Sequence, residues 1–383
     1  MFLQNLHKRH NMNPFLPFVS LTIILCVGCH SKPLSIASEQ VTYPGATLSS
    51  LTELMDAIEV VRLQHGDSIL TDDRVKLLQQ DSSFYLVDIL GKQNIYRFGY
   101  DGRFLNKIGE KGQGPEEFSY MLDINIEEKD DCVHVLSQPY CTIVRYSKNG
   151  TFKERKQAAL PANGFCRSGN GYWLLAGYGD RTLLLHLDNS LHVTDSVRLI
   201  QFFMDKIPYP LQKFSSFAGQ SFFWQFPFPT VHCITPDTVQ QALFFDFKDQ
   251  YIPTPTTPQR EPIEDKKITC ISKYWENSTY ALAEIGTREK KQKIMLNIYG
   301  LKNKASGQWQ WVEYITTPEK PFIPDWYPTR TKGFAQDGRL MCFFFGNEIE
   351  ELTDEARKLI TNPQELENID PEMDMFVLLC RFK

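Results

Sequence analysis

The sequence predicts an all-β fold, a six-bladed β-propeller, and three observations lead to this prediction. Short segments that alternate apolar and polar residues fill the chain after residue 50. A strand–turn–strand pattern recurs at a fixed offset along the chain. Aromatic residues make up 13% of the sequence, with 27 Phe and 16 Tyr, and such side chains suit the half-buried face of a pleated sheet.

The first residues of the chain are typical of an export signal. Lys8 and Arg9 precede an apolar run, Phe15–Val27, which is shorter than the roughly 20 apolar residues that a membrane-spanning helix needs. The run ends at Gly28-Cys29, and a small residue just before a cysteine resembles the bacterial lipobox. We therefore expect Cys29 to become the lipidated first residue of the mature protein. The alternative is an ordinary signal peptide that is cut nearby.

The mature chain is expected to begin with a tether. Residues 29–50 are mostly polar and contain Ser, Pro and Gly, which is typical of a linker. We therefore divide the sequence into a lipoprotein signal peptide over 1–28, a tether over 29–50 and a six-bladed propeller domain over 51–383.

The repeat is clearest in the first half of the domain. Ile95–Phe98 matches Ile143–Tyr146 at an offset of 48 residues, and the turn residues Gly102 and Gly150 are separated by the same 48. An Asp-Gly or Asn-Gly turn between two strands is the strongest short-range signal for a β-hairpin. The strand before this hairpin recurs six times: Phe84–Val87, Val133–Leu136, Tyr172–Leu175, Ser221–Trp224, Ser278–Ala283 and Leu340–Phe345.

Six such units predict six blades, because units of about 40–60 residues made of short strands are typical of propellers. The earlier strand Ile58–Leu63 is expected to complete the last blade and close the ring, since closure removes unpaired strand edges. Within the last blade, apolar residues at helical spacing over Asn347–Thr361 predict a short helical insertion with Asn347 as its N-cap.

One segment of the chain resembles a known family. Asp101–Leu105, Ile108-Gly109 and Gly112–Phe118 are similar to the NHL-like six-bladed propeller lipoproteins of anaerobic Gram-negative gut bacteria. In that family the glycine-rich segment leads from the outer strand of one blade to the inner strand of the next, and a final strand like Met375–Lys383 closes the ring. The resemblance implies a fold and an address in the cell envelope, and it implies no established activity.

The resemblance also bears on which side of the outer membrane carries the anchor. Some surface-exposed lipoproteins of such bacteria have acidic residues just after the lipidated cysteine. His30, Ser31 and Lys32 follow Cys29, and none of them is acidic. The periplasmic face is therefore favoured over the cell surface.

Motifs for cofactors and metals are missing from the sequence. The run Gly109–Gly114 lacks the Lys-Ser/Thr pair of a phosphate-binding loop, and no Cys-x-x-Cys spacing points to zinc. We therefore expect no cofactor and no metal. His134, His186 and His232 could bind a metal if they pointed into the central channel, but core or surface histidines are the simpler interpretation.

Cysteines offer one candidate cross-link. Cys132 and Cys141 flank an expected hairpin turn and could form a disulfide, because exported proteins can keep such bonds. The alternative is a pair of buried thiols in neighbouring strands.

An aromatic-rich stretch over residues 202–228 suggests a binding surface, since exposed aromatic side chains can stack on sugars or bind partner proteins. Core packing is the alternative for these side chains. The candidate partner-binding aromatics are Phe214, Phe217, Trp224, Phe226, Trp326 and Tyr327.

The functional expectation follows from these features. A net charge of -5 without a basic stripe argues against nucleic acid as a partner. We expect a lipid-anchored, non-catalytic binding or scaffolding propeller for a protein or glycan partner. The alternatives are an envelope lyase or hydrolase with a site at the channel mouth, and a purely structural lipoprotein in a larger assembly.

Overall fold

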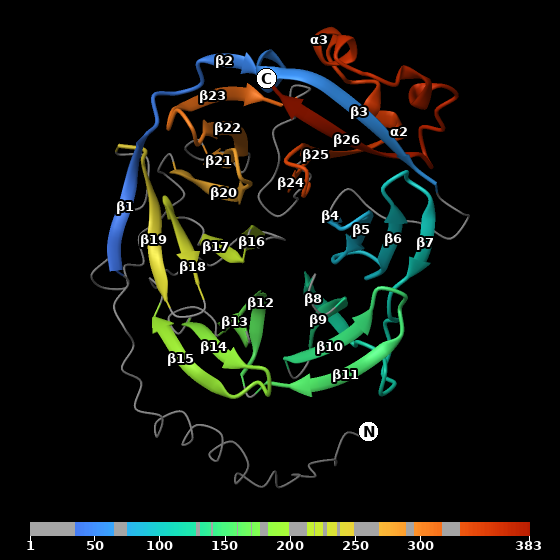
Figure 1. Ribbon diagram of the computed structural model, residues 1–383, viewed down its shortest axis with the longest axis vertical. Helices are drawn as coiled ribbons and strands as arrows, with labels where there is room; N and C mark the ends of the chain where they lie inside the picture. The colour runs from blue at the N-terminus through green and yellow to red at the C-terminus, as the bar shows by residue number, and fades with distance from the viewer. Residues whose placement is uncertain are drawn as a thin grey trace, which may run out of the picture.

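Six β-sheets stand around a central axis, which confirms the predicted six-bladed β-propeller (Figure 1). The computed structural model describes residues 35–64, 75–127, 131–138, 141–158, 160–169, 171–176, 183–198, 213–217, 219–224, 228–235, 238–248, 268–288, 295–315 and 330–383.

The first three blades follow one another along the chain, and the strands of each run in sequence order from the axis outward. Blade 1 consists of β4 (Val75–Gln80), β5 (Ser83–Asp88), β6 (Ile95–Gly99) and β7 (Phe104–Lys107). Blade 2 consists of β8 (Tyr120–Glu127), β9 (Cys132–Gln138), β10 (Thr142–Ser147) and β11 (Phe152–Gln157). Blade 3 consists of β12 (Ala162–Ser168), β13 (Gly171–Ala176), β14 (Leu183–Asp188) and β15 (Val193–Arg198).

The next blades keep this order, and the last one borrows a strand from the beginning of the chain. Blade 4 consists of β16 (Phe214–Phe217), β17 (Gln220–Trp224), β18 (Thr230–Ile234) and β19 (Val239–Asp246). Blade 5 consists of β20 (Ile268–Glu276), β21 (Tyr280–Arg288), β22 (Met295–Asn303) and β23 (Trp309–Tyr314). Blade 6 consists of β24 (Thr331–Phe334), β25 (Leu340–Phe345), β26 (Met375–Phe382) and β3 (Met55–Leu63).

The ring closes between the two ends of the domain, as the sequence predicted for Ile58–Leu63. Strand β3 pairs antiparallel with β26, from Met375 opposite Leu63 to Phe382 opposite Met55. Blade 6 therefore combines three C-terminal strands with one strand from the N-terminal side, so backbone hydrogen bonds within this blade join the two ends of the domain.

Part of the expected tether over 29–50 is paired strand. Strand β1 (Ser35–Thr42) adds a fifth strand to blade 4 by parallel pairing with β19. Strand β2 (Leu48–Ser50) adds a fifth strand to blade 5 by parallel pairing with β23 and leads into the 3₁₀ turn η1 (Leu51–Leu54). Residues 35–63 thus follow the outer rim of three consecutive blades (Figure 1).

The structure explains why glycine recurs at the same turn position of the 48-residue repeat. Gly102 has a φ of +81°, and a Cβ atom there would lie 2.1 Å from the carbonyl oxygen of Arg62 in β3. Gly150 has a φ of +86°, and its Cβ would lie 2.8 Å from the carbonyl oxygen of Lys107 in β7. Each hairpin turn therefore approaches the outer strand of the preceding blade so closely that only glycine fits.

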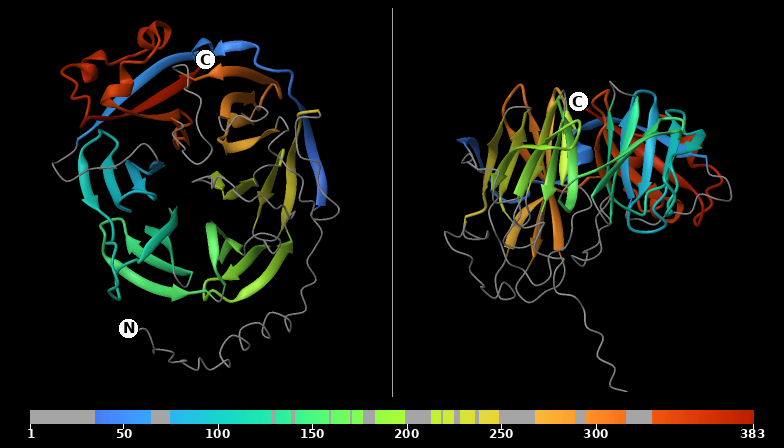
Figure 2. Two further views of the ribbon diagram at one scale, coloured as in Figure 1. Left: turned by 180° about the vertical axis from the view of Figure 1, so that it is seen from behind. Right: turned by 90° about the horizontal axis from the view of Figure 1, so that it is seen from below.

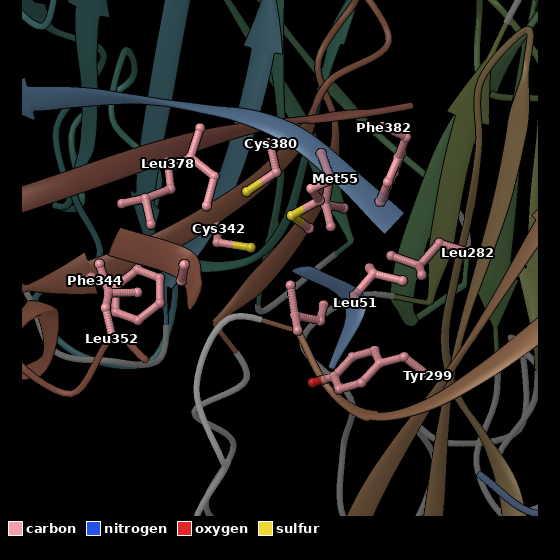
Figure 3. Close-up of a cluster of buried hydrophobic side chains, with 14 of the residues drawn as sticks. Leu51, Met55, Leu282, Tyr299, Cys342, Phe344, Leu352, Leu378, Cys380 and Phe382 are labelled. Carbon is pink, nitrogen blue, oxygen red and sulfur yellow. The ribbon is translucent and has the colours of Figure 1, made fainter. Parts of the chain in front are cut away.

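Apolar side chains fill the space between neighbouring blades, because both faces of each sheet are covered. Strand β5 is buried at every position, as is β13. Figure 3 shows the cluster between blades 5 and 6, where β3, β21, β22, β25 and β26 contribute side chains together with η1 and the C-terminal helices. Its labelled members are Leu51, Met55, Leu282, Tyr299, Cys342, Phe344, Leu352, Leu378, Cys380 and Phe382.

The predicted insertion in blade 6 consists of two short helices instead of one. Helix α2 (Gly346–Ile349) starts directly after β25, so its N-cap is Phe345 and not Asn347. The backbone is extended again at Thr353, which caps α3 (Asp354–Lys358) by accepting from the backbone N–H of Ala356. The 3₁₀ turn η4 (Pro363–Leu366) follows, and these helices lie outside the ring (Figure 2). Among the residues described above, no helix is long and apolar enough to cross a membrane.

Candidate functional site

Charged side chains occur on the strands nearest the propeller axis or directly beside them, where apolar residues would be expected. Lysine is rarely buried in proteins unless it is paired, yet three lysines of these strands are less than 10% exposed. We call the group the axial cluster, and its members are Lys76, Asp123, Lys213, Lys273, Glu284 and Lys332.

The best-defined contact of the axial cluster joins the inner strands of blades 1 and 2. The Lys76 Nζ in β4 donates to Asp123 Oδ1 in β8 at 2.9 Å and to the carbonyl oxygen of Ile124 at 2.9 Å. Asp123 also accepts from two backbone N–H groups, those of Ile124 at 2.8 Å and of Phe165 in β12 at 3.2 Å. One buried carboxylate thus links three consecutive blades.

Two further lysines hydrogen-bond to the backbone of a neighbouring blade. Lys332 Nζ in β24 donates to the carbonyl oxygen of Val75 in β4 at 2.9 Å. Lys213 Nζ, just before β16, donates to the carbonyl oxygen of Asn163 in β12 at 2.9 Å. Both ammonium groups are therefore held in place by neutral acceptors of the adjacent inner strand.

The last pair of the cluster lies within blade 5. Lys273 of β20 stands opposite Glu284 of β21 in the strand register, and its Nζ lies 3.5 Å from Glu284 Oε2. The Glu284 side chain is completely buried, and the Lys273 ammonium also lies 5.7 Å from the centre of the Trp275 ring. This contact is long for a charge-assisted hydrogen bond.

β-bulges occur on the inner strands at the depth of this cluster. The pairing shifts between Met121 and Asp123 in β8, between Ile271 and Lys273 in β20, and around Lys332 in β24. A bulge redirects the side chains of its strand and is frequent beside functional sites. The charged residues of blades 2, 5 and 6 therefore stand where the inner strands depart from regular pairing.

Lys213 is the member of the cluster whose pKa departs most clearly from its ordinary value. Burial lowers the pKa of Lys213 to about 8, and the nearby Asp123 carboxylate opposes this shift. The Lys213 side chain nevertheless keeps partial contact with solvent. It is thus the member of the cluster that a ligand can reach most directly.

The predicted aromatic surface is largely core. Phe214 is 5% exposed and Trp224 is 1% exposed, so both lie inside the protein and cannot bind a partner. The correction has a simple cause: β16 and β17 pair within blade 4, and the faces of this blade pack against blades 3 and 5. Phe214 therefore lies in the cluster with blade 3 and Trp224 in the cluster with blade 5. Phe217, at the end of β16, is half-buried with the Lys304 ammonium 5.7 Å from its ring centre.

The three strand histidines are separate packing residues. His134 bonds to the Tyr172 hydroxyl at 3.0 Å, and burial lowers its pKa to about 3. His186 contacts the Thr194 hydroxyl at 2.7 Å, and His232 packs against Phe223. Over the residues that the structure describes, no group of three or more His, Cys, Asp or Glu side chains is placed to hold a metal ion.

The predicted Cys132–Cys141 disulfide is wrong, and the hairpin register explains why. Cys132 pairs with Ser147 at one end of the hairpin, whereas Cys141 precedes Thr142, which pairs with Ser137 at the other end. At ~3.4 Å per residue the two cysteines are about 20 Å apart, while a disulfide needs Cα atoms within roughly 7 Å. Both residues are buried free thiols.

Some predicted residues fall outside the described ranges. Cys29, Phe226, Trp326 and Tyr327 all lie there. The lysines of the axial cluster, by contrast, lie within the described ranges, but the sequence did not lead us to predict them. The local signal at Lys76 is a single lysine among apolar residues, in Val75-Lys76-Leu77-Leu78.

Comparison with known proteins supports the fold and identifies the family. One similar structure is that of a Bacteroides fragilis protein described as exported, with 13% identity, a TM-score of 0.69, and coverage of 90% of this chain and 100% of the other. A member of the DUF4221 family from Bacteroides vulgatus has 11% identity, a TM-score of 0.53, and coverage of 86% and 99%. At such identities the likeness concerns the fold alone.

Curated proteins give no match to the chain. A family model described as "Domain of unknown function (DUF4934)" matches residues 42–381, which is almost the whole propeller. The NHL-like assignment remains a prediction. The chain belongs to the DUF4934 family.

Proposed function

We propose that this chain is an exported lipoprotein, anchored through Cys29, whose propeller binds a glycan near its axis without catalysing a reaction. The observation that supports this proposal best is the axial cluster, whose buried charges are held by contacts between blades. Such fixed polar groups suit recognition, because a rigid site loses little conformational entropy when a ligand binds.

A glycan fits this site better than a protein partner does. Lys76, Lys273 and Lys332 are each less than 10% exposed, so a flat protein surface would not reach their ammonium groups. A single sugar residue or the end of a saccharide chain would approach the cluster at Lys213, which is only partly buried. Export agrees with the charged and apolar start of the sequence and with the likeness to a Bacteroides protein described as exported.

The lipid anchor is tested by metabolic labelling with a fatty acid. We expect the wild-type chain to be labelled and Cys29→Ala to be exported without label, because only the lipobox cysteine receives the lipid. Cys26→Ala is the matched control, since it removes a thiol three residues away and should leave the labelling intact. Equal labelling of Cys29→Ala and wild type would contradict the anchor.

Glycan binding is tested on an array of neutral and acidic saccharides with the exported, unlipidated Cys29→Ala chain. We expect retention on one saccharide class, and recovery of that saccharide at unchanged length. A second prediction accompanies it: Lys213→Met should weaken retention, whereas Lys358→Met, a change on the exposed surface of α3, should not. Retention of envelope proteins with a blank array would favour the protein partner instead.

A lyase is the second candidate, and one observation favours it. An amine whose pKa is near 8 can act as a general base close to neutral pH, and Lys213 meets this condition beside the Asp123 carboxylate. Such a base could remove a proton next to a sugar carboxylate. Appearance of the ultraviolet absorbance of an unsaturated uronate, lost in Lys213→Met, would replace the binding proposal with this one.

A further inference from the structure

We infer that the propeller stands on the lipid bilayer by the outer rim of blade 4, where β1 begins, with the rim of blade 1 turned away from the lipid. This inference rests on the proposed lipid anchor at Cys29 and deepens it, because it names the surface of the domain that meets the membrane. The ring axis then runs along the bilayer, and both ends of the ring stay accessible to solutes.

Strand β1 fixes the point at which the chain leaves the propeller. It pairs in parallel with β19 over Ser35–Thr42. Val41 is buried in the apolar cluster that blades 4 and 5 share, and the rings of Tyr43 and Trp311 lie edge to face with their centres 4.9 Å apart. Backbone pairing and apolar burial thus make this segment part of the rim.

The chain between the proposed anchor and β1 is short, since Ser35 is the sixth residue after Cys29. A fully extended chain spans at most ~3.6 Å per residue, so the lipidated residue lies within about 22 Å of the start of β1. A folded domain of this size measures about 50 Å across. The anchor therefore holds the rim of blade 4 at the bilayer, and it places no such limit on the opposite rim.

Blade 1 carries the opposite rim. In a ring of six blades the first and the fourth face each other across the axis, and Figure 1 shows β1 and β7 at opposite edges of the ring. Leu105 of β7 is 39% exposed. A propeller that stands on blade 4 turns this side chain away from the lipid.

The turns at one end of the ring argue against a flat orientation. In each blade the first and third hairpin turns lie at this end, because neighbouring strands are antiparallel. Here Lys148 is 11% exposed, and its partners Asp81 and Asp131 are 40% and 69% exposed. Arg339 likewise is less exposed than its partner Asp337. These carboxylates project further into solvent than the cations that pair with them, so an anionic lipid surface would repel this end of the ring.

Fluorescence quenching by the bilayer tests the orientation. The lipidated chain receives one added cysteine with a water-soluble dye and is reconstituted in vesicles of phosphatidylethanolamine and phosphatidylglycerol that contain a headgroup nitroxide. The variants are Gln40→Cys on β1, Leu105→Cys on β7 and Ser82→Cys in the turn between β4 and β5, all at exposed positions. Cysteines within the described ranges are buried, so the wild-type chain serves as the labelling control.

We expect the nitroxide to quench most of the fluorescence at Gln40→Cys and little of it at Leu105→Cys and Ser82→Cys, because only the rim of blade 4 is held against the lipid. A Gly-Ser insertion of ~20 residues after Lys32 should lower the quenching at Gln40→Cys, since a long flexible tether releases the rim. Each variant should melt at the wild-type temperature, because the replaced side chains are exposed.

Flotation with the vesicles separates a failure of the anchor from a failure of the orientation. A chain that does not float with the vesicles would refute the anchor and the inference with it. A chain that floats but is quenched equally at Gln40→Cys and Leu105→Cys would overturn the inference and leave the anchor intact. Ser82→Cys then tells the two flat orientations apart, since it is quenched only when the ring lies on its acidic turns.

Discussion

A chain that lacks Met375–Lys383 is expected to lose cooperative folding altogether. All of these residues except Lys383 form β26, which pairs with β25 on one side and with β3 on the other, so their loss breaks both blade 6 and the closure of the ring. Every residue of β26 except Arg381 is buried. At about 1.5–3 kcal/mol for each buried apolar side chain, the loss is on the order of 10–20 kcal/mol, which matches or exceeds the total stability of most proteins.

Circular dichroism and urea denaturation of the exported chain would measure this effect. Point substitutions within the same strand give a graded control: Leu378→Ala, at a fully buried position, should cost about 2–5 kcal/mol, while Arg381→Ala, whose side chain is 63% exposed, should cost less than about 1 kcal/mol. A truncated chain with the urea midpoint of the full-length protein would show that the ring does not depend on this closure.

The blades could be predicted because their signals are local. A turn such as Asp101-Gly102 specifies a hairpin within a few residues, and its recurrence at Asn149-Gly150 specifies the repeat. The structure adds the reason that glycine occupies both turns, namely the close approach of Gly102 to Arg62 and of Gly150 to Lys107. The closing strand Ile58–Leu63 could also be predicted. It precedes the first full repeat and has no partner there, and pairing with the last blade removes the unpaired edges of both.

The added strands β1 and β2 could not be predicted in the same way. Residues 35–50 have the composition of a linker, and their pairing with β19 and β23 depends on where those outer edges lie in space. Register explains the failed disulfide as well. The spacing of Cys132 and Cys141 fits a hairpin, but only the paired residues show that they stand at opposite ends of it.

The axial cluster was hidden for a related reason. Lys76, Lys273 and Lys332 are each the single basic residue of their strand, and Lys213 directly precedes β16. The sequence gives no sign that these four lysines come from four blades to the strands around one axis. For the aromatic residues the sequence predicted a site that the structure does not show. Their density suggested a surface, but in a propeller both faces of every blade are covered, so Phe214 and Trp224 became core.

Removing the negative charge of Asp123 is expected to destabilise the fold by about 3–5 kcal/mol, because Asp123→Asn leaves the Lys76 ammonium buried without a counter-charge. The asparagine can still accept from the backbone N–H of Ile124, so the lost charge dominates the effect. Adding Lys76→Met to the same chain should recover most of the stability, since it removes the unpaired charge and keeps an unbranched apolar side chain in its place.

Urea denaturation of wild type, both single variants and the double variant completes a thermodynamic cycle for this pair. The exposed pair Lys107–Glu110 provides the control, and Glu110→Gln should change stability by less than about 1 kcal/mol. If Asp123→Asn were as mild as Glu110→Gln, the Lys76–Asp123 contact would behave as a solvated surface pair, and not as a pair that is buried between two blades. If the double variant were no more stable than Asp123→Asn, the carboxylate would act mainly through the backbone of β8 and β12. A large loss of stability in Asp123→Asn, most of which Lys76→Met restores in the double variant, is the pattern expected of a buried ion pair between two blades.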